Sequence, residues 1–235
     1  MRAAVVVFPG INADAEMVRT LRDVCGVPTT VVRHTESALP TGTELVAIPG
    51  GFSYGDYLRA GAIAKVAPII QPIVEHAKRG GYVLGVCNGF QILTEIGLLP
   101  GALTRNQAMR FACGDVYVKV SAVGPFTPKL DAVWRLPVAN GEGRYQATDR
   151  VLAELEQSGS IALQYCDKSG AITDEANSSG AVRNIAAIYG GPHKNVFGVM
   201  PHPERMSEAI LGGTDGRTIF DTVIAAHAAS ATSAA

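Results

Sequence analysis

The segment Tyr82-Val-Leu-Gly-Val-Cys-Asn-Gly-Phe-Gln-Ile-Leu93 decides the fold of this chain. Its first five residues are mostly apolar, which is typical of a buried strand, and we predict a tight turn through Asn88-Gly89 and a helix over residues 90–96. The spacing Gly85-x-Cys87-x-Gly89 is the thiol counterpart of the G-x-S-x-G nucleophile elbow. Cys87 is therefore expected at a helix N-terminus, where free N–H groups and the helix dipole stabilise a thiolate.

A second segment, Pro201-His-Pro-Glu-Arg205, carries the candidate base. It follows an apolar stretch over residues 195–200, so His202 is expected at the carboxyl end of a strand, where open α/β sheets bind their ligands. Glu204 can point the same way as His202 if the segment is extended. We predict Cys87 as the nucleophile, His202 as the general base and acid, and Glu204 as the group that orients the imidazole.

The sequence does not favour a metal site. The H-x-E spacing of His202 and Glu204 occurs in zinc deaminases, but the C-x-x-C that completes their signature is missing here. The four cysteines are too far apart for a zinc knuckle; they are Cys25, Cys87, Cys113 and Cys166. We therefore expect no bound metal.

The order of apolar segments predicts an α/β fold. Strands are expected at residues 3–8, 29–33, 45–48 and 82–86, with helices at 14–24 and 68–79. Short apolar strands separated by helices indicate a single open, mostly parallel, doubly wound sheet of flavodoxin-like type with helices on both faces. Residues 113–120 alternate between apolar and polar side chains and are followed by Pro, Gly and further short strands, so residues 105–195 are expected to add mixed or antiparallel strands to this sheet. We expect one domain over residues 1–228 and an Ala/Ser-rich, frayed tail over residues 229–235.

Composition narrows the class of protein. The chain has 235 residues, 47% of them hydrophobic, and a net charge of −1, which gives no reason to expect nucleic-acid or anionic-membrane binding. No apolar run approaches the roughly 20 residues of a membrane span, and no signal peptide is expected at the N-terminus. Dispersed cysteines do not resemble a disulfide framework, so we expect a reducing, cytoplasmic location.

The turn Pro49-Gly-Gly-Phe52 follows an expected strand and so belongs to the same sheet edge as Cys87. Glycines there expose backbone N–H groups, which are the donors that an oxyanion hole needs. Neither G-x-x-x-x-G-K-[ST] nor G-x-G-x-x-G occurs at a strand–helix junction. We therefore expect no ATP site and no bound cofactor in this chain.

Four stretches resemble the class I (triad) glutamine amidotransferases: residues 49–64, 84–103, 141–145 and 200–205. The resemblance runs from Val5 to about Phe220. The elbow and His-Pro-Glu are shared across that class, whereas the loop over residues 50–64 is more specific to the glutaminase subunits of one split synthetase.

The resemblance implies an activity, a site and partners. Glutamine would be hydrolysed to glutamate and ammonia through a thioester on Cys87, with Cys87, His202 and Glu204 at the triad positions. The oxyanion hole and glutamine-binding residues would be Gly50, Gly51, Phe52, Asn88 and Gln91. The implied partners are a synthetase subunit, which binds ATP, magnesium and formylglycinamide ribonucleotide in purine biosynthesis, and a small bridging subunit.

Four residues depart from the family pattern. Where the family usually has Ser, Cys, a basic residue and His, this chain has Ile11, Ala13, Gly114 and Asn140. None belongs to the triad, so hydrolysis is still expected, but contacts with the synthetase can differ.

Two other readings stay open. One is a free-standing enzyme of the related Cys-elbow superfamily, which includes PfpI-like hydrolases and glyoxalases; these lack His-Pro-Glu after the last strand, so residues 202–204 disfavour it. The other is a non-catalytic subunit that uses the fold as a scaffold, and an intact triad disfavours that one.

Overall fold

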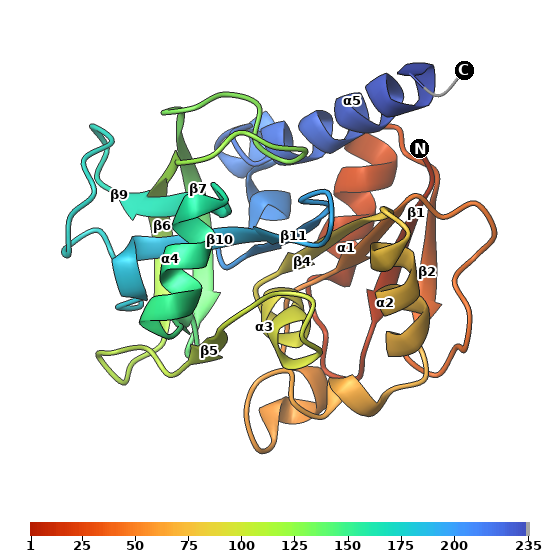
Figure 1. Ribbon diagram of the computed structural model, residues 1–235, viewed down its shortest axis with the longest axis horizontal. Coiled ribbons are helices and arrows are strands. Elements are labelled where there is room, and N and C mark those ends of the chain that lie inside the picture. Colours follow the sequence, from red (N-terminus) through yellow and green to blue (C-terminus); the bar gives the residue numbers. More distant parts are fainter. Residues whose placement is uncertain (234–235) are drawn as a thin grey trace.

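A computed structural model of the chain describes residues 1–233, with side chains up to residue 230. Nine strands form one sheet in the order β2-β1-β3-β4-β11-β10-β9-β6-β7, shown in Figure 1. Their bounds, in sheet order, are β2 Thr29–Arg33, β1 Ala3–Val7, β3 Leu45–Ile48, β4 Tyr82–Val86, β11 Val196–Val199, β10 Ile185–Gly190, β9 Ile161–Cys166, β6 Ala112–Val120 and β7 Val133–Asn140.

The sheet has a parallel and an antiparallel half, as predicted. β2, β1, β3, β4 and β11 pair in parallel. β11, β10, β9, β6 and β7 pair antiparallel, so the strands within residues 105–195 extend the sheet in the expected way. A separate antiparallel pair joins β5 (Ala102–Thr104) to β8 (Arg144–Gln146).

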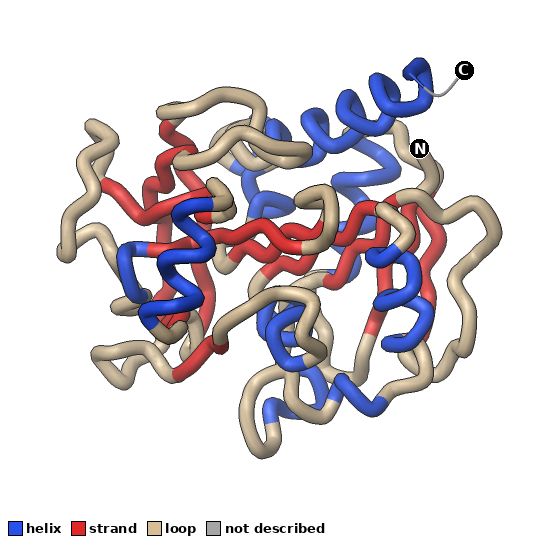
Figure 2. Tube along the Cα trace, viewed as in Figure 1, coloured by secondary structure: helices blue, strands red, loops and turns tan. Residues whose placement is uncertain are grey.

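Helices cover both faces of the parallel half. α2 (Ile70–Lys78) and α3 (Asn88–Glu95) lie in front of the strands in Figure 1, and α1 (Asp14–Arg19) lies behind them and continues as a π-helical segment, Thr20–Val24. The other helices are α4 (Asp149–Gln157) and α5 (Arg217–Ser233). Figure 2 shows the strands as one continuous layer between these helices. Pro72 is the third residue of α2, where an N–H has no partner within the helix, so the proline is tolerated.

The described part of the C-terminal tail, residues 229–233, belongs to α5, and its fraying stays a prediction. Residues 234–235 of the predicted tail lie outside the described residues. Within the part of the chain that the structure describes, no helix has the length and apolar character needed to cross a membrane.

Two glycines let α3 lie directly on the sheet. Gly85 of β4 and Gly198 of β11 are paired across the sheet. A Cβ on Gly85 would lie 2.5 Å from Cδ1 of Leu93, and one on Gly198 would collide with Cδ2 of Phe90; both side chains belong to α3. Because no Cβ is present at either position, the helix packs closely and its N-terminus is fixed at the carboxyl end of β4.

Candidate active site

Cys87 makes the turn between β4 and α3 by itself. Its φ is 51° and its ψ is −105°, and α3 already begins at Asn88. The predicted turn through Asn88-Gly89 is therefore wrong: these residues form the first helical turn, and the strain is concentrated at Cys87. A Cβ on Gly89 would collide with the carbonyl oxygen of Ile48, which explains the glycine two residues after the cysteine.

The sulfur is nearly enclosed. Cys87 is 5% exposed, and its N–H donates to the carbonyl oxygen of Val199 at 2.8 Å, which ties the elbow to β11. Its Sγ lies 3.9 Å from the carbonyl oxygen of Ala139 on β7. The nucleophile candidate thus lies between the carboxyl end of β4 and the edge strand β7.

His202 and Glu204 form a buried pair. Nδ1 of His202 lies 2.6 Å from Oε1 of Glu204, so the ring N–H donates to the carboxylate, and the two residues are 2% and 1% exposed. Nε2 of His202 has no hydrogen-bond partner among the described residues. A Cβ built on Gly50 would lie 2.6 Å from Cε1 of His202 and 3.3 Å from Cβ of Cys87. The structure therefore brings all three predicted triad residues together, and Gly50 lies between His202 and Cys87.

The charges around His202 favour the protonated form of its ring. Burial alone would lower the pKa of His202, but the Glu204 carboxylate and the Cys87 sulfur outweigh burial and raise this pKa.

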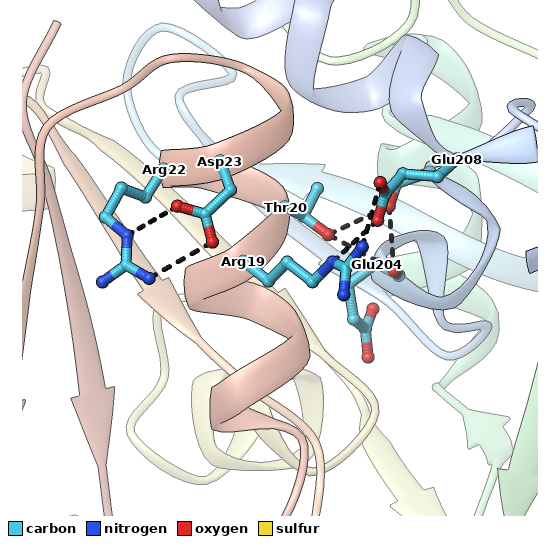
Figure 3. Close-up of polar contacts among 7 residues, drawn as sticks. Arg19, Thr20, Arg22, Asp23, Glu204 and Glu208 are labelled. Atoms are coloured by element: carbon cyan, nitrogen blue, oxygen red, sulfur yellow. Dashed lines mark hydrogen bonds and ion pairs between the residues drawn. The ribbon is translucent and has the colours of Figure 1, made fainter. Parts of the chain in front are cut away.

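The segment after the triad is fastened to the first helix, as Figure 3 shows. Thr20 donates from Oγ1 to the carbonyl oxygen of Glu204 at 3.3 Å, and Arg19 holds Glu208 through two hydrogen bonds of 2.9 and 3.2 Å. The backbone N–H of His202 donates to the carbonyl oxygen of Pro137 at 2.8 Å. These contacts restrict the backbone that positions His202 and Glu204.

The predicted oxyanion hole needs one correction. The N–H of Phe52 donates to the carbonyl oxygen of Gly10 at 2.9 Å, so it is not available to a substrate. The N–H of Gly51 donates to no acceptor within residues 1–233, and that of Asn88 begins α3, where no partner within the helix exists. Gly51 and Asn88 are thus the two candidate donors. A Cβ on Gly51 would lie 2.6 Å from Cα of Ile11, so only glycine fits there.

Two adjoining cavities, of about 200 and 130 Å³, meet at the cysteine. Both are lined by Gly51, Phe52, Cys87, Phe111 and Ala139. The larger is also lined by Asp56, Gln91, Asn140, Gly141 and Glu142, and the smaller by Asn12, His202 and Arg205. This space suits a small metabolite rather than a polymer.

Gln91 lines the larger cavity but has both ends of its amide occupied. Its Nε2 donates to the carbonyl oxygen of Glu142 at 2.7 Å, and its Oε1 accepts from Nδ2 of Asn88 at 2.8 Å. We therefore assign Gln91 a role in shaping the wall of the cavity. The prediction that it binds glutamine directly stays a prediction.

The lining side chains that were not predicted include Asp56, Phe111 and Glu142. Asp56 and Glu142 lie inside Gly-rich stretches that the resemblance had marked, and an acidic residue within such a stretch was the available signal. Phe111 carried no comparable signal, because a single aromatic residue before a strand is common.

The four departures have different surroundings. Ile11 forms an isolated bridge with Gly51, and Ala13 is fully buried at the start of α1 without a side-chain cap. Gly114 lies in β6 with a φ of 148°. Asn140 lines the larger cavity, is 3% exposed, and has no partner for either amide atom among the described residues. Within residues 1–233, no three His, Cys, Asp or Glu residues are grouped so that they could hold a metal ion.

The fold and these contacts define a class: α/β proteins with a cysteine on a strand-to-helix elbow and a His–Glu pair at the same sheet edge. A model of the CobB/CobQ-like glutamine amidotransferase domain matches residues 1–213. The chain belongs to this glutamine amidotransferase family.

Several curated relatives are similar to this chain over nearly their whole length. The chain is 50% identical to phosphoribosylformylglycinamidine synthase subunit PurQ of Bradyrhizobium diazoefficiens, over 94% of this chain and 95% of the relative. It is 48% identical to the same subunit of Gloeobacter violaceus, over 96% and 97%. A chain in the structure of PurLQS from Thermotoga maritima superposes with a TM-score of 0.83 at 38% identity, covering 95% of this chain and 97% of that one.

Thiol labelling tests the placement of Cys87. Burial is the main factor that raises the pKa of both Cys25 and Cys166 to about 11, so neither thiol is expected to react quickly at neutral pH. A chloroketone analogue of glutamine is expected to label Cys87, and glutamine is expected to protect it. Cys113 is exposed and provides the control, because iodoacetamide should modify it with or without glutamine. Peptide mass spectrometry that found the analogue on another cysteine would contradict the assignment.

Proposed function

We propose that this chain is the glutaminase subunit of a phosphoribosylformylglycinamidine synthase. It hydrolyses glutamine and passes ammonia to a synthetase that converts formylglycinamide ribonucleotide to formylglycinamidine ribonucleotide in purine biosynthesis. The observation that carries the proposal is the buried Nδ1–Oε1 contact of 2.6 Å between His202 and Glu204 beside Cys87, in a chain about 50% identical to PurQ subunits.

In the first half-reaction, Cys87 attacks the side-chain amide carbon of glutamine. The carbonyl oxygen becomes an oxyanion, which the N–H groups of Gly51 and Asn88 stabilise. His202 donates its proton to the departing nitrogen, so ammonia leaves and a γ-glutamyl thioester remains on the sulfur. Glu204 holds the ring with Nδ1 protonated, which leaves Nε2 to transfer the proton.

In the second half-reaction, the now neutral His202 takes a proton from water. The resulting hydroxide attacks the thioester carbonyl, the same two N–H groups stabilise the second oxyanion, and the carbon–sulfur bond breaks. Glutamate leaves, and Cys87 and His202 return to their starting charges. No step requires a metal or an organic cofactor.

The proposed partners are a PurL-like synthetase subunit and a PurS-like bridging subunit. ATP and magnesium are proposed to bind on the synthetase, since this sequence has no phosphate-binding loop at a strand–helix junction. We propose the cytoplasm as the site of the reaction, because the four cysteines are all free and a reducing compartment preserves a reactive thiol.

The loop over residues 52–61 offers a docking point for the synthetase. Tyr57 and Leu58 are 74% and 92% exposed, which is unusual for large apolar side chains unless a partner covers them. Tyr54, Asp56 and Leu58 have positive φ values of 53°, 54° and 73°, so the loop is strained. Asn88 connects this loop to the elbow, because its Oδ1 accepts from the N–H of Ser53 at 3.0 Å.

Reconstitution tests the proposal. The chain alone is expected to hydrolyse glutamine slowly, and the synthetase with its nucleotide ligands is expected to raise the rate by about a hundredfold, because docking fixes the Gly51 and Asn88 donors. The measurement is glutamate release by the chain alone and in the complex, with and without nucleotide.

A matched pair of variants locates the docking point. Leu58→Asp is expected to reduce the activation by the synthetase, whereas Val31→Asp is expected to leave it unchanged. Val31 is also exposed and apolar, at 52%, but it lies on β2 at the far edge of the sheet. Full-speed hydrolysis by the isolated chain, or equal loss in both variants, would exclude this mode of activation.

A further inference from the structure

A buried hydroxyl group on the first helix contacts the backbone of Glu204 (Figure 3). Oγ1 of Thr20 donates to the carbonyl oxygen of Glu204 at 3.3 Å, although 184 residues separate the two in sequence. We propose that Thr20 is a positioning residue for glutamine hydrolysis, which holds the Glu204 backbone so that the carboxylate orients the His202 ring. This inference rests on the function proposed above, and it concerns a residue that lines neither cavity at Cys87.

Thr20 is the only buried polar residue within residues 14–24. The buried side chains of α1 and of the π-helical segment that follows it are Met17, Thr20 and Leu21, and Thr20 is 1% exposed. A buried hydroxyl group destabilises a fold unless it is hydrogen-bonded, so an aliphatic residue would serve packing at least as well. What threonine adds at this position is therefore its hydrogen bonding to the segment after β11.

The hydroxyl of Thr20 reaches across to another element, unlike those of two other helical threonines. Thr94 and Thr222 donate to carbonyl oxygens three and four residues earlier in their own helices, which is the common arrangement. Thr20 begins the π-helical segment, in which the N–H of Cys25 donates to the carbonyl oxygen of Thr20, five residues earlier. Segments of this kind are rare and often lie at functional sites. The unusual helix geometry and the long-range hydrogen bond thus occur at the same residue.

Ser207 completes a buried polar cluster around the Glu204 carbonyl group. Oγ of Ser207 donates to the same carbonyl oxygen at 3.1 Å and lies 3.1 Å from Oγ1 of Thr20. Ser207 is also 1% exposed, so these contacts are shielded from solvent. Ser207 follows Glu204 by only three residues, whereas Thr20 belongs to a different element. Thr20 is therefore the member of the cluster that fixes the segment relative to the rest of the fold.

The position of the Glu204 carboxylate depends on this backbone anchor. Its Oε1 contacts Nδ1 of His202 at 2.6 Å, while its Oε2 has no hydrogen-bond partner among the described residues. The backbone of His202 is fixed separately, because its N–H donates to the carbonyl oxygen of Pro137 on β7. With one anchor at each residue, the backbone sets the distance between ring and carboxylate. A shift at Glu204 would therefore change the orientation of the His202 ring, and small misplacements of this kind slow catalysis.

The test variant is Thr20→Val, which keeps the shape of the side chain and removes its hydroxyl group. In the reconstituted complex, kcat for glutamine hydrolysis is expected to fall about tenfold and KM to stay within about twofold, because the triad is misplaced while the substrate cavity is unchanged. Thr20→Ser restores a hydroxyl group and is expected to recover most of the rate. If both variants lose the same activity, the loss comes from packing and the inference is wrong.

Thr222→Val is the matched control. It makes the same chemical change in a partly buried threonine, but the hydroxyl that it removes is bonded only within α5. It is expected to match the unmodified chain in kcat and KM. If Thr222→Val lost as much kcat as Thr20→Val, the removal of any helical hydroxyl would account for the effect, and Thr20 would have no particular role.

A double-mutant cycle separates positioning from a general effect on the fold. Glu204→Ala removes the carboxylate that Thr20 is proposed to position. Thr20→Val should therefore lower kcat about tenfold in the unmodified chain, but less than about twofold when it is added to Glu204→Ala. The same tenfold loss in both backgrounds would show that Thr20 does not act through Glu204, and the proposal would be overturned.

The pH profile of kcat gives a further readout. The Glu204 carboxylate and the Cys87 sulfur raise the pKa of His202, so its ring stays protonated as the pH rises until that higher pKa is passed. A carboxylate displaced from Nδ1 raises this pKa less, so the rate of Thr20→Val should begin to fall at a lower pH. The charged side chains that α1, β7 and α5 bring near this segment are paired: Arg19 with Glu208, Glu16 with Arg205, Arg135 with Asp115, and Arg217 with Asp221. A profile identical to that of the unmodified chain would contradict the inference.

The two proposals fail in different ways. If Cys87→Ala hydrolyses glutamine at the rate of the unmodified chain, the proposed function is wrong. If the unmodified chain hydrolyses glutamine through Cys87 but Thr20→Val has the same kcat and pH profile, the function stands and only the positioning role of Thr20 is wrong.

Discussion

Replacement of Cys87 by alanine is expected to remove glutamine-dependent synthesis in the reconstituted complex, by about ten-thousandfold or more. The expected loss is this large because, in the proposed mechanism, the sulfur forms the covalent bond to the glutamyl group. Among the described residues that line both cavities, no other side chain is a nucleophile that could replace it. Synthesis from added ammonium should continue at the unmodified rate, because ammonium enters after the step that needs the thiol.

Cys113→Ala is the matched control for this experiment. Cys113 is a free cysteine on the exposed face of β6, so its replacement changes a thiol without touching the elbow. It should leave both glutamine- and ammonium-dependent synthesis intact. If ammonium failed to bypass Cys87→Ala, the chain would contribute more to synthesis than ammonia, and the proposed division of work between subunits would be wrong.

His202→Ala is expected to have an effect of similar size, with glutamine hydrolysis reduced about 10⁴- to 10⁶-fold. Nε2 of His202 has no other partner in the described part of the chain, which leaves it as the one buried group placed to move the proton. Glu204→Gln should also reduce the rate of hydrolysis, but its loss should be about a hundredfold smaller than that of His202→Ala. The reason is that Glu204 acts through the ring that it orients. Glutamate release measured across a pH series checks both variants.

The pH series also tests the charge of the pair. The Glu204 carboxylate raises the pKa of His202, so the ring keeps its proton as the pH rises until that higher value is passed. Glu204→Gln removes this charge, and the pH at which His202 loses its proton should fall. Glu208→Gln is the control, since Glu208 lies in the same segment but pairs with the exposed Arg19. A profile that shifted equally in both variants would contradict the assignment of Glu204.

The elbow shows how far local sequence predicts the site. The apolar strand over residues 82–86 and the glycines around Cys87 predicted a cysteine at a helix N-terminus, and the structure has it there. Alternation of short apolar strands with helices predicted the parallel half of the sheet, and the pattern within residues 105–195 predicted the antiparallel half. The boundaries were less certain, because Asn88-Gly89 is compatible both with a turn and with the start of a helix.

Packing decides between a turn and the start of a helix at Asn88-Gly89. Gly89 lies against the carbonyl oxygen of Ile48, and Gly85 lies under Leu93, so α3 can begin directly after Cys87. Local propensity does not include the contacts that a neighbouring element supplies.

The sequence by itself determined the class of fold, and it placed the candidate nucleophile on an elbow and the His–Glu pair after a strand, because each depends on residues close together in the chain: 82–93 for the elbow and 201–205 for the pair. Only the tertiary structure decided which backbone N–H groups remain free. The N–H of Phe52 donates to the carbonyl oxygen of Gly10, a residue that is distant in sequence. It alone also placed Asp56 beside Glu142, from loops more than eighty residues apart. Hydrogen-bond satisfaction and like-charge repulsion depend on distances in space, so neither can be read from the order of residues along the chain.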